Sequence, residues 1–347
     1  MPFPDQISLS LPPPTEVGAL GVFQLKRLWA RARAARRGRP LEGDTMELHR
    51  DGLVRDALGV GLEQTQQFLL QNDPSFEELE RWIVATAGAP DAMLVARINA
   101  AVSDAPPPEA TRGWLAEIDA MPPVLDAADL AHWDEHGYVI VHDAVPEDSR
   151  RAAVDAIWQH EHANPDDPAT WHAPRRQGIM MSMVQHPAFT ANRRSLRVHK
   201  AFAQLWGTAD LWMTCDRGGF NPPLRPGEKF NATDLHWDMS LARPMPFGVQ
   251  GILYLTDTPP EQGAFRCVPG FHRRLDAWLD SLPPGADPRA QDLHGLGVKH
   301  IGGRAGDLVI WNDKLPHAAS PNRGVRPRIV QYLTMYSARV APSAVWV

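Results

Sequence analysis

Two hydrophobic patterns divide the chain near residue 120. From Thr45 to about Ser103, apolar residues recur at the three- and four-residue spacing of amphipathic helices. Beyond Ser195, short apolar runs alternate with Gly- and Pro-rich turns. The strands predicted there cover residues 197–206 (with mixed signals), 211–216, 232–239, 247–256, 264–268, 297–301, 306–311 and 328–337. Many short strands with turn signals are typical of a sandwich or jelly-roll barrel rather than a parallel sheet.

These patterns predict three regions. Residues 1–17 are Pro-rich and expected to be flexible, residues 18–120 form a helical N-terminal region, and residues 121–347 form a mainly β domain with flanking helices. A helix predicted at 275–282 and the Pro-, Gly- and Asp-rich loop that follows it, to about Asp292, interrupt the strands. The interruption is long for a jelly-roll connection, so we expect it to act as an active-site lid.

A basic segment opens the helical region. Its cationic residues are Lys26, Arg27, Arg31, Arg33, Arg36, Arg37 and Arg39, with no acid among them. The segment either binds an anionic partner or is a solvated helix face that pairs with acids elsewhere. We favour pairing, because the chain as a whole is acidic and no aromatic residues interleave the charges as in single-strand binding sites. The helices themselves would form a homodimer surface, cover the barrel mouth or dock a carrier-bound substrate, and dimer formation ranks first.

Composition excludes several classes. The formal net charge of -6 provides no general attraction to nucleic acid. No apolar run approaches the roughly 18 residues of a transmembrane helix, so we expect no integral membrane segment. Two widely spaced cysteines, Cys215 and Cys267, form neither a disulfide framework nor a zinc pattern. Together with the lack of a secretory signal pattern, they predict a cytoplasmic protein.

Three His-x-Asp pairs are candidate metal ligands. Two of them, at His49 and His132, lie in predicted helical sequence, where residues two apart diverge by about 200°. Only His236 and Asp238 lie in a predicted strand, where side chains two apart point to the same face. With a second His, they would form the two-His, one-carboxylate set that holds Fe(II) and leaves positions open. The alternative is a polar pair on an exposed strand face.

Downstream residues support the metal interpretation. A buried strand at 306–311 leads to His317, and Arg328 follows 11 residues later, at the start of the next predicted strand. Two consecutive antiparallel strands of a jelly roll can place such a pair at one mouth of the barrel. The Arg guanidinium would then hold a dicarboxylate whose other end chelates the metal.

Several motifs occur in order along the second half of the chain: LHWD, GILYLTDTPPEQGAFRCVPGFH, AGDLVIW and HAASPNRGVRPR. In this order and spacing they resemble the phytanoyl-CoA dioxygenase-like (PhyH) family of Fe(II)/2-oxoglutarate-dependent oxygenases. A weaker match, HWDEHGYVIVHDAVPED, extends the resemblance to about residues 125–347. The resemblance implies a double-stranded β-helix, a cupin-like jelly roll that requires Fe(II), 2-oxoglutarate and O₂.

The resemblance also assigns residues. It implies that His236, Asp238 and His317 are the iron ligands and that Arg328, rather than Arg326, binds the distal carboxylate of 2-oxoglutarate. The family often has a hydroxyl residue two positions after the second His. This chain has Ala319 there, so Ser320 or another hydroxyl would assist. Further candidates for co-substrate contact are Asn231 and Thr233, and candidates for the substrate pocket are Trp237, Met239, Trp311, Arg217 and Asn221.

The expected function follows from this site. The chain would be a dioxygenase that hydroxylates an unactivated C–H bond of a small-molecule substrate and releases succinate and CO₂. Desaturation or ring formation would need only a different fate of the substrate radical. Two other functions stay open: a hydrolase or isomerase that uses another divalent metal in the same ligands, and a non-catalytic jelly-roll binding protein.

Overall fold

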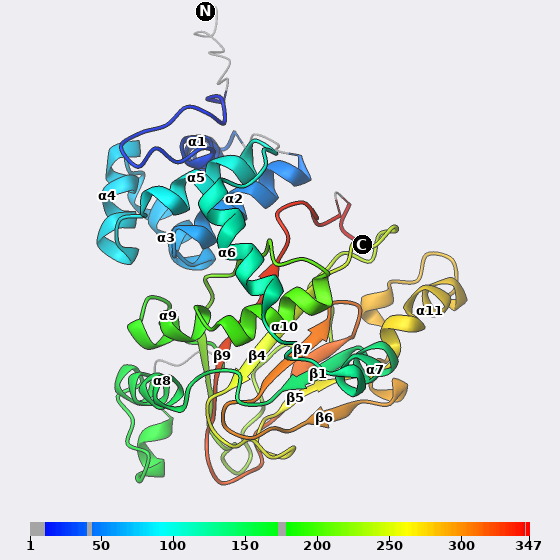
Figure 1. Ribbon diagram of the computed structural model, residues 1–347. Helices are drawn as coiled ribbons and strands as arrows, with labels where there is room; N and C mark the ends of the chain where they lie inside the picture. The colour runs from blue at the N-terminus through cyan, green and yellow to red at the C-terminus, as the bar shows by residue number, and fades with distance from the viewer. Residues whose placement is uncertain (1–10, 40–43, 173–177, 344) are drawn as a thin grey trace, which may run out of the picture. The chain divides into compact units, whose positions relative to one another are not determined.

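A computed structural model describes residues 11–39, 44–172, 178–343 and 345–347 (Figure 1). It divides into two compact units, Met1–Trp114 and Leu115–Val347. The flexibility predicted for residues 1–17 concerns a segment whose first ten residues lie outside the described part of the chain.

The first unit is helical, as its apolar spacing predicts. Its helices are α1 (Leu25–Arg36), α2 (Thr45–Ala57), α3 (Leu62–Asn72), α4 (Phe76–Ala87) and α5 (Ala92–Val102), and α6 (Glu109–Ala120) spans the boundary between the units. A capping box begins α4, because the Ser75 hydroxyl accepts from the Glu78 amide at 3.2 Å and the Glu78 carboxylate accepts from the Ser75 amide at 2.6 Å. Fully buried Leu79 and Ile83 of α4 contribute to the core of this unit.

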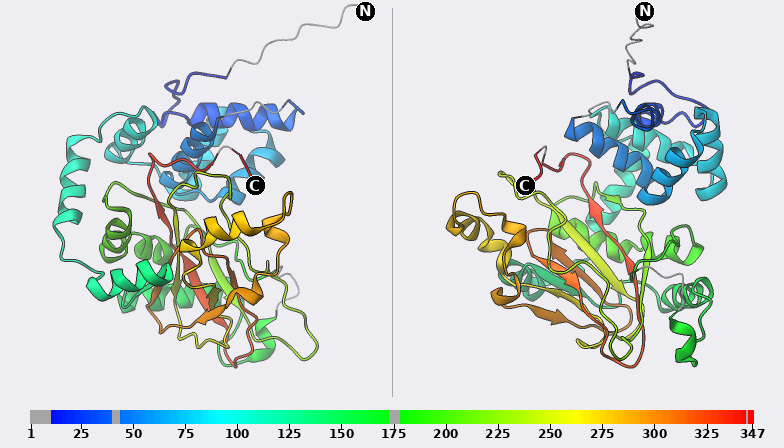
Figure 2. Two further views of the ribbon diagram at one scale, coloured as in Figure 1. Left: turned by 90° about the vertical axis from the view of Figure 1, so that its right-hand side faces the viewer. Right: turned by 180° about the vertical axis from the view of Figure 1, so that it is seen from behind.

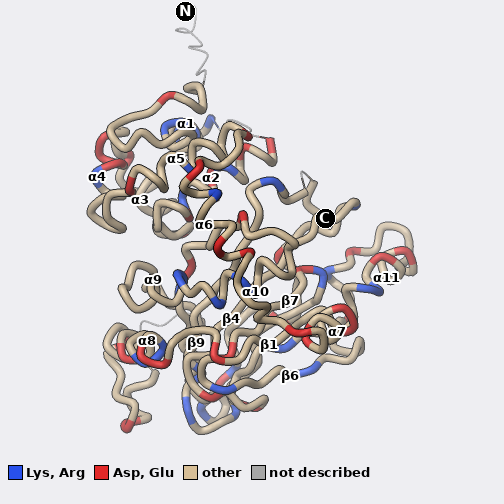
Figure 3. The backbone as a smooth tube through the Cα atoms, viewed as in Figure 1, with Lys and Arg blue, Asp and Glu red and all other residues tan. Residues whose placement is uncertain are grey.

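Most of the basic residues along α1 pair with acids of the same unit. Figure 3 marks the positions of the Lys, Arg, Asp and Glu residues along the backbone. Arg31 is 7% exposed and contacts the carboxylates of Glu47 and Asp51. Arg33 donates to Asp73 at 2.9 Å. The interpretation of the basic segment as a helix face that pairs with acids is therefore confirmed for these residues.

The second unit combines helices with short strands. Its helices are α7 (Ala127–His136), α8 (Glu147–His160), α9 (Pro187–Arg193), α10 (Leu196–Trp206) and α11 (Leu275–Ser281), with 3₁₀ turns at Pro168–Trp171, Phe271–Arg273, Pro288–Ala290 and His294–Leu296. Its strands are β1 (Tyr138–Val141), β2 (Trp212–Met213), β3 (Gly218–Asn221), β4 (Val249–Tyr254), β5 (Phe265–Cys267), β6 (Lys299–Ile301), β7 (Leu308–Asn312), β8 (His317–Ala319), β9 (Arg328–Tyr332) and β10 (Met335–Tyr336).

The strands form antiparallel sheets, as the short-strand pattern predicts (Figure 2). The larger sheet has the order β1-β7-β4-β9-β3, a smaller one has the order β6-β5-β8, and β10 pairs with β2. One apolar core joins the two main sheets. The rings of Phe265 on β5 and Trp311 on β7 have centroids 4.3 Å apart. The inner faces of the two sheets therefore enclose the core from which the site residues project.

Helices cover the opposite face of the larger sheet. A Cβ on Gly251 of β4 would lie 3.0 Å from the Phe202 ring of α10, so this strand position has no room for a side chain. Asn192 of α9 donates to the Gln331 side chain of β9 at 2.8 Å, and both residues are fully buried. The helices thus pack against the outer face of the larger sheet, and the site residues lie on its inner face.

Two of the predicted strands are not strands in the structure. Residues 197–206 form α10, because Val198, Ala201 and Phe202 bury one helical face and the Ser195 side chain caps the first turn at Val198. Residues 232–239 form no continuous strand. There only His236 pairs, in an isolated bridge with His317.

Among the described residues, no helix is both long and apolar enough to span a membrane. Cys215 and Cys267 are both buried, and neither forms a disulfide within the described part of the chain.

Candidate metal centre

Three side chains converge as the His-x-Asp pattern predicts. Nε2 of His236 lies 3.2 Å from Oδ1 of Asp238, and Nε2 of His317 lies 3.3 Å from Oδ2 of Asp238. The three potential ligand atoms all fall within 4.8 Å of one another. The other two His-x-Asp pairs begin at His49 in α2 and His132 in α7, and neither belongs to a cluster of metal-binding type among the described residues.

The backbone sets the spacing of the two histidines. The amide of His236 donates to the carbonyl of His317 at 3.1 Å, and the amide of His317 donates back at 3.0 Å. His317 also begins β8, where it lies opposite Cys267 of β5. The bridge therefore connects the irregular segment around His236 to the smaller sheet, and the imidazole centroids lie 4.9 Å apart.

Backbone carbonyls orient both imidazoles. Nδ1 of His236 donates to the Asp234 carbonyl at 2.6 Å, and Nδ1 of His317 donates to the Leu315 carbonyl at 3.0 Å. A carbonyl only accepts, so Nδ1 of each ring carries a proton and Nε2 faces Asp238, where it donates when protonated and offers its lone pair to a metal when the ring is neutral. This outer hydrogen bond is typical of histidines that bind metal.

The electrostatics of the cluster favour a cation. Burial alone would raise the pKa of Asp238, but hydrogen bonds from His236 and His317 outweigh it and hold the pKa well below its usual range. The hydrogen bond to Asp238 raises the pKa of His236 above its ordinary value. A divalent metal at this position would replace the protons that otherwise bridge the three side chains, so binding would release protons.

Arg328 lies in the same cavity as the three ligands. The cavity has a volume of about 370 Å³. Arg328 begins β9 and is 1% exposed, yet its Nε and Nη2 atoms have no hydrogen-bond partner among the described residues. A buried guanidinium without partners is costly, so its presence indicates an anionic ligand opposite it. Two imidazoles, one carboxylate and a nearby cation fit Fe(II) with a chelating dicarboxylate.

Some predicted residues lie in the cavity wall. Asn231, Thr233 and Trp311 line it together with the ligands and Arg328. The Trp311 ring packs against His317 with centroids 5.1 Å apart. His272 does not line this cavity, and its Nε2 hydrogen-bonds the Asp134 carbonyl at 3.1 Å.

Five other predicted residues are not among those that line this cavity in the described part of the chain. Trp237 belongs to the core, and its Nε1 donates to the Lys314 carbonyl at 3.0 Å. Met239 packs at the edge of the same core. The hydroxyl of Ser320 donates to the Ala264 carbonyl at 2.7 Å.

The remaining two lie on or beside β3. The Arg217 carbonyl accepts from the Tyr332 amide at 3.1 Å. The Asn221 side chain donates to the Ser320 carbonyl at 3.1 Å and lines a second cavity.

Sequence reasoning missed other cavity residues. Gln250 and Ile252 of β4 line the cavity, as do Tyr332 of β9, Asp216 and Met180. Nε2 of Gln250 donates to Oδ2 of Asp238 at 3.1 Å. The alternation of side chains along a strand could have identified two of these residues. Ile252 faces the same side of β4 as Gln250, and Tyr332 faces the same side of β9 as Arg328.

A buried acid stands behind Gln250. Burial, with a further contribution from the Asp238 charge, raises the pKa of Asp313 to about 7, although a hydrogen bond from Gln250 opposes both effects. The Gln250 amide thus serves two carboxylates, Asp238 at the metal centre and Asp313 in the interior.

The loop predicted as a lid is fastened to the backbone around Asp238. Arg289, in the 3₁₀ turn Pro288–Ala290, donates from Nη1 to the Trp237 carbonyl at 2.7 Å and from Nη2 to the Met239 carbonyl at 2.6 Å. Farther along the loop, His294 contacts Asp234 at 2.9 Å. The loop therefore holds the backbone of the segment that carries His236 and Asp238 in place.

Comparison with known proteins agrees with this site. The sequence profile of the family described as phytanoyl-CoA dioxygenase (PhyH) matches residues 133–330, more than half of the chain. A Dictyostelium discoideum protein that carries a phytanoyl-CoA dioxygenase name is 21% identical over 256 residues, and the match covers 59% of this chain and 73% of that protein.

Solved structures that match this chain include AviO1 from Streptomyces viridochromogenes, which is 17% identical, with a TM-score of 0.44 over 65% of this chain and 100% of its own. The carbocyclase SnoK from nogalamycin biosynthesis, described as non-heme and alpha ketoglutarate dependent, is 19% identical, with a TM-score of 0.45 over 65% of this chain and 90% of its own. The family assignment rests on the profile match, which spans the His-Asp-His cluster and Arg328. The chain therefore belongs to the phytanoyl-CoA dioxygenase family of Fe(II)/2-oxoglutarate-dependent oxygenases.

Proposed function

We propose that this oxygenase hydroxylates an unactivated C–H bond of a small molecule, with His236, Asp238 and His317 as the iron ligands and Arg328 as the anchor of 2-oxoglutarate. The observation that carries the proposal is the pairing of a three-ligand cluster with a buried, unpartnered guanidinium in one cavity. The reaction would convert 2-oxoglutarate and O₂ to succinate and CO₂ and place one oxygen atom in the product.

Bound Fe(II), with 2-oxoglutarate and O₂, supplies the oxidation of the C–H bond. The protein provides geometry around it. Carbonyl-bound Nδ1 protons turn both histidines toward the centre, and the Gln250 amide holds one oxygen of Asp238. Arg328 would neutralise and orient the distal carboxylate of 2-oxoglutarate by charge-assisted hydrogen bonds.

Apolar side chains would place the substrate and exclude water. Met180, Ile252, Phe265 and Trp311 line the cavity beside the ligands. A hydrocarbon segment against these walls leaves its C–H bonds as the nearest oxidisable groups. This arrangement supports hydroxylation, and a substrate held differently would give desaturation instead.

The proposed fold of residues 121–347 is a double-stranded β-helix. Facing antiparallel sheets that share one core support it. Every residue of the proposed site belongs to the second unit.

We assign the helical region at 18–120 to self-association as a homodimer, which light scattering of the full chain and of a chain without these residues would test.

The metal and co-substrate assignment has a direct spectroscopic test. Anaerobic protein with Fe(II) and 2-oxoglutarate should show the weak visible charge-transfer band of the chelate. The band should disappear in His317→Ala and persist in His300→Ala, which removes an exposed histidine of β6. Arg328→Ala should need much more 2-oxoglutarate for the same band, whereas Arg326→Ala should behave like the wild type. A folded, iron-loaded wild type without the band would refute the assignment.

A further inference from the structure

A second cavity adjoins the metal cavity. It has a volume of about 300 Å³ and shares Gly178, Ile179 and Asn231 with the metal cavity. Its other walls come from the turn that follows β3 and from the end of the 3₁₀ turn at Pro168–Trp171. A ligand too long for the metal cavity would therefore extend past Ile179 and Asn231 into this space, which we call the outer cavity.

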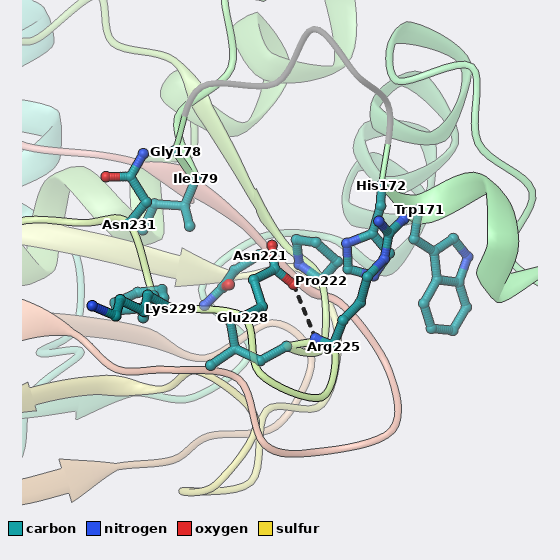
Figure 4. Close-up of a pocket in the computed structure, with 12 residues that line it drawn as sticks. Trp171, His172, Gly178, Ile179, Asn221, Pro222, Arg225, Glu228, Lys229 and Asn231 are labelled. Atoms are coloured by element: carbon teal, nitrogen blue, oxygen red, sulfur yellow. Dashed lines mark hydrogen bonds between the residues drawn. The ribbon is translucent and has the colours of Figure 1, made fainter.

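Cationic side chains outnumber anionic ones around the outer cavity. Among the described residues that line it, Arg225 and Lys229 are cations, His172 presents an imidazole, and Glu228 carries the one carboxylate. Figure 4 shows Arg225 and His172 on the side opposite Ile179 and Asn231, so the width of the cavity separates them from the shared rim. A group bound beside Arg225 would thus lie at the far end from the metal centre.

The one carboxylate is engaged by the backbone. Oε2 of Glu228 accepts from the Arg225 amide at 2.9 Å, and the Glu228 amide donates to the Arg225 carbonyl at 3.0 Å. These bonds close the turn that presents Arg225. No ion pair joins the two side chains in the described structure, so the Arg225 guanidinium remains available to a ligand.

His172 experiences this positive environment. Burial lowers the pKa of His172, and the nearby Arg225 charge lowers it further, although Glu228 opposes that effect. An anion bound beside His172 would raise this lowered pKa and favour the protonated imidazole, which can then donate to the anion.

The floor and walls suit an organic substrate. Trp171 is buried beside the cavity, and Ile179, Pro222 and Leu224 add apolar surface. Asn221, whose amide is already bound to the Ser320 carbonyl, is a rigid part of the floor. Apolar walls with charge at one end are the usual composition of a site that orients a small molecule.

We propose that the outer cavity binds the anionic group, a carboxylate or a phosphate, of the substrate whose C–H bond is oxidised at the metal centre, with Arg225 and His172 as its main contacts. This inference rests on the proposed function and adds to it a substrate class: an organic acid with a hydrocarbon portion that reaches the metal cavity.

Calorimetric titration of metal-free protein tests the proposal without turnover. The probes are hexanoate, hexyl phosphate and neutral 1-hexanol, which share one six-carbon chain. We expect at least one anion to bind more tightly than hexanol, and Arg225→Gln to weaken that anion on the order of tenfold without a change for hexanol. A preference for hexanoate identifies a carboxylate, and a preference for hexyl phosphate identifies a phosphate.

Two further variants locate the binding. Arg339→Gln removes an exposed cation outside both cavities and should leave all affinities unchanged. Arg328→Ala separates the outer cavity from the co-substrate position, and anion binding should persist in it. Anions that bind no better than hexanol at millimolar concentration, or whose affinity depends on Arg328 and not on Arg225, would overturn the proposal.

The experiments distinguish a failure of the proposed function from a failure of the proposed anion site. Arg225→Gln should keep the Fe(II)/2-oxoglutarate band with the wild-type requirement for 2-oxoglutarate, because Arg225 does not line the metal cavity. A wild type without the band refutes the metal assignment. A wild type that has the band but does not distinguish anionic from neutral probes refutes only the anion site.

Discussion

Gln250 holds the carboxylate of Asp238, with 3.1 Å between Nε2 of the amide and Oδ2 of the acid. The other oxygen, Oδ1, lies 3.2 Å from Nε2 of His236. The amide thus limits rotation of the only carboxylate among the three ligands. Its position on β4, in the middle of the larger sheet, makes that orientation a property of the fold.

Replacing Gln250 by Leu should weaken metal binding by about tenfold, because outer hydrogen-bond partners of metal ligands typically contribute that much. Leu preserves most of the volume and removes the donor. Titration with Mn(II), with circular dichroism as a check of folding, measures the change. Gln67→Leu, at an exposed position of α3, is the control and should bind like the wild type. Equal affinities in all three proteins would show that the Asp238 carboxylate is oriented without Gln250.

The pH dependence of metal affinity should follow His236. Its pKa lies above the ordinary value because of Asp238, so the imidazole gains a proton as the pH falls through that raised pKa. The metal needs the neutral imidazole, so affinity should fall by up to about tenfold per pH unit below this point and level off above it. Mn(II) titrations at several pH values measure the slope. An affinity that stays constant across this range would contradict protonation of His236 as the competing reaction.

Asp313 should make the metal-free protein less stable as the pH rises. Its pKa is about 7 in the folded protein, against an ordinary value of 3.8. Between these values the folded chain holds a proton that the unfolded chain has lost, so stability falls with rising pH, by at most about 1.4 kcal/mol per pH unit. Urea unfolding of wild type and Asp313→Asn should be measured at pH 5, 6 and 7 (values chosen to span roughly this window). As the pH rises, the free energy of unfolding of the wild type should fall relative to that of the variant. A constant difference between the two proteins would show that Asp313 does not titrate there.

Loss of Arg289 should loosen the loop over residues 283–298. Arg289→Ala would leave the Trp237 and Met239 carbonyls without their side-chain donor, at a cost of about 1–3 kcal/mol. We expect faster chymotryptic cleavage within this loop and a several-fold loss of Mn(II) affinity, since the same carbonyls flank Asp238. Arg273→Ala, which removes an exposed cation near α11, is the matched control. Cleavage at the wild-type rate would refute the buttress role of Arg289.

The sequence predicted which side chains converge better than it predicted the strands that carry them. His236 and Asp238 were recognisable because ligand chemistry restricts residue types and the two lie two positions apart. His317, 81 residues on, was recognisable from its 11-residue spacing to Arg328 and from the resemblance to the PhyH family. The expected strand around His236 was not observed, because only one backbone pair joins it to β8. Residues 197–206 were misassigned although Val198, Ala201, Phe202 and Leu205 recur at helical spacing, so the helical period was present in the sequence and was overlooked.

Outer contacts were harder to predict. Gln250 looks like an ordinary polar position on a half-buried strand, and only the pairing of β4 with β7 and β9 places it beside Asp238. The contact between Arg289 and the Trp237 carbonyl depends on the path of a long loop, which local sequence does not determine. The same holds for Arg225, whose relation to the metal cavity arises from two segments that meet at Ile179 and Asn231.

The single bridge between His236 and His317 restricts insertions and deletions in the chain next to these two residues. Side chains alternate across a paired backbone, so an insertion or deletion of one codon beside either histidine would present Trp237 or Ala318 where a ligand belongs. The 81-residue separation of the two histidines tolerates change only away from its ends. Length differences among relatives should therefore gather in the loop over residues 283–298, far along the chain from both ends of the bridge.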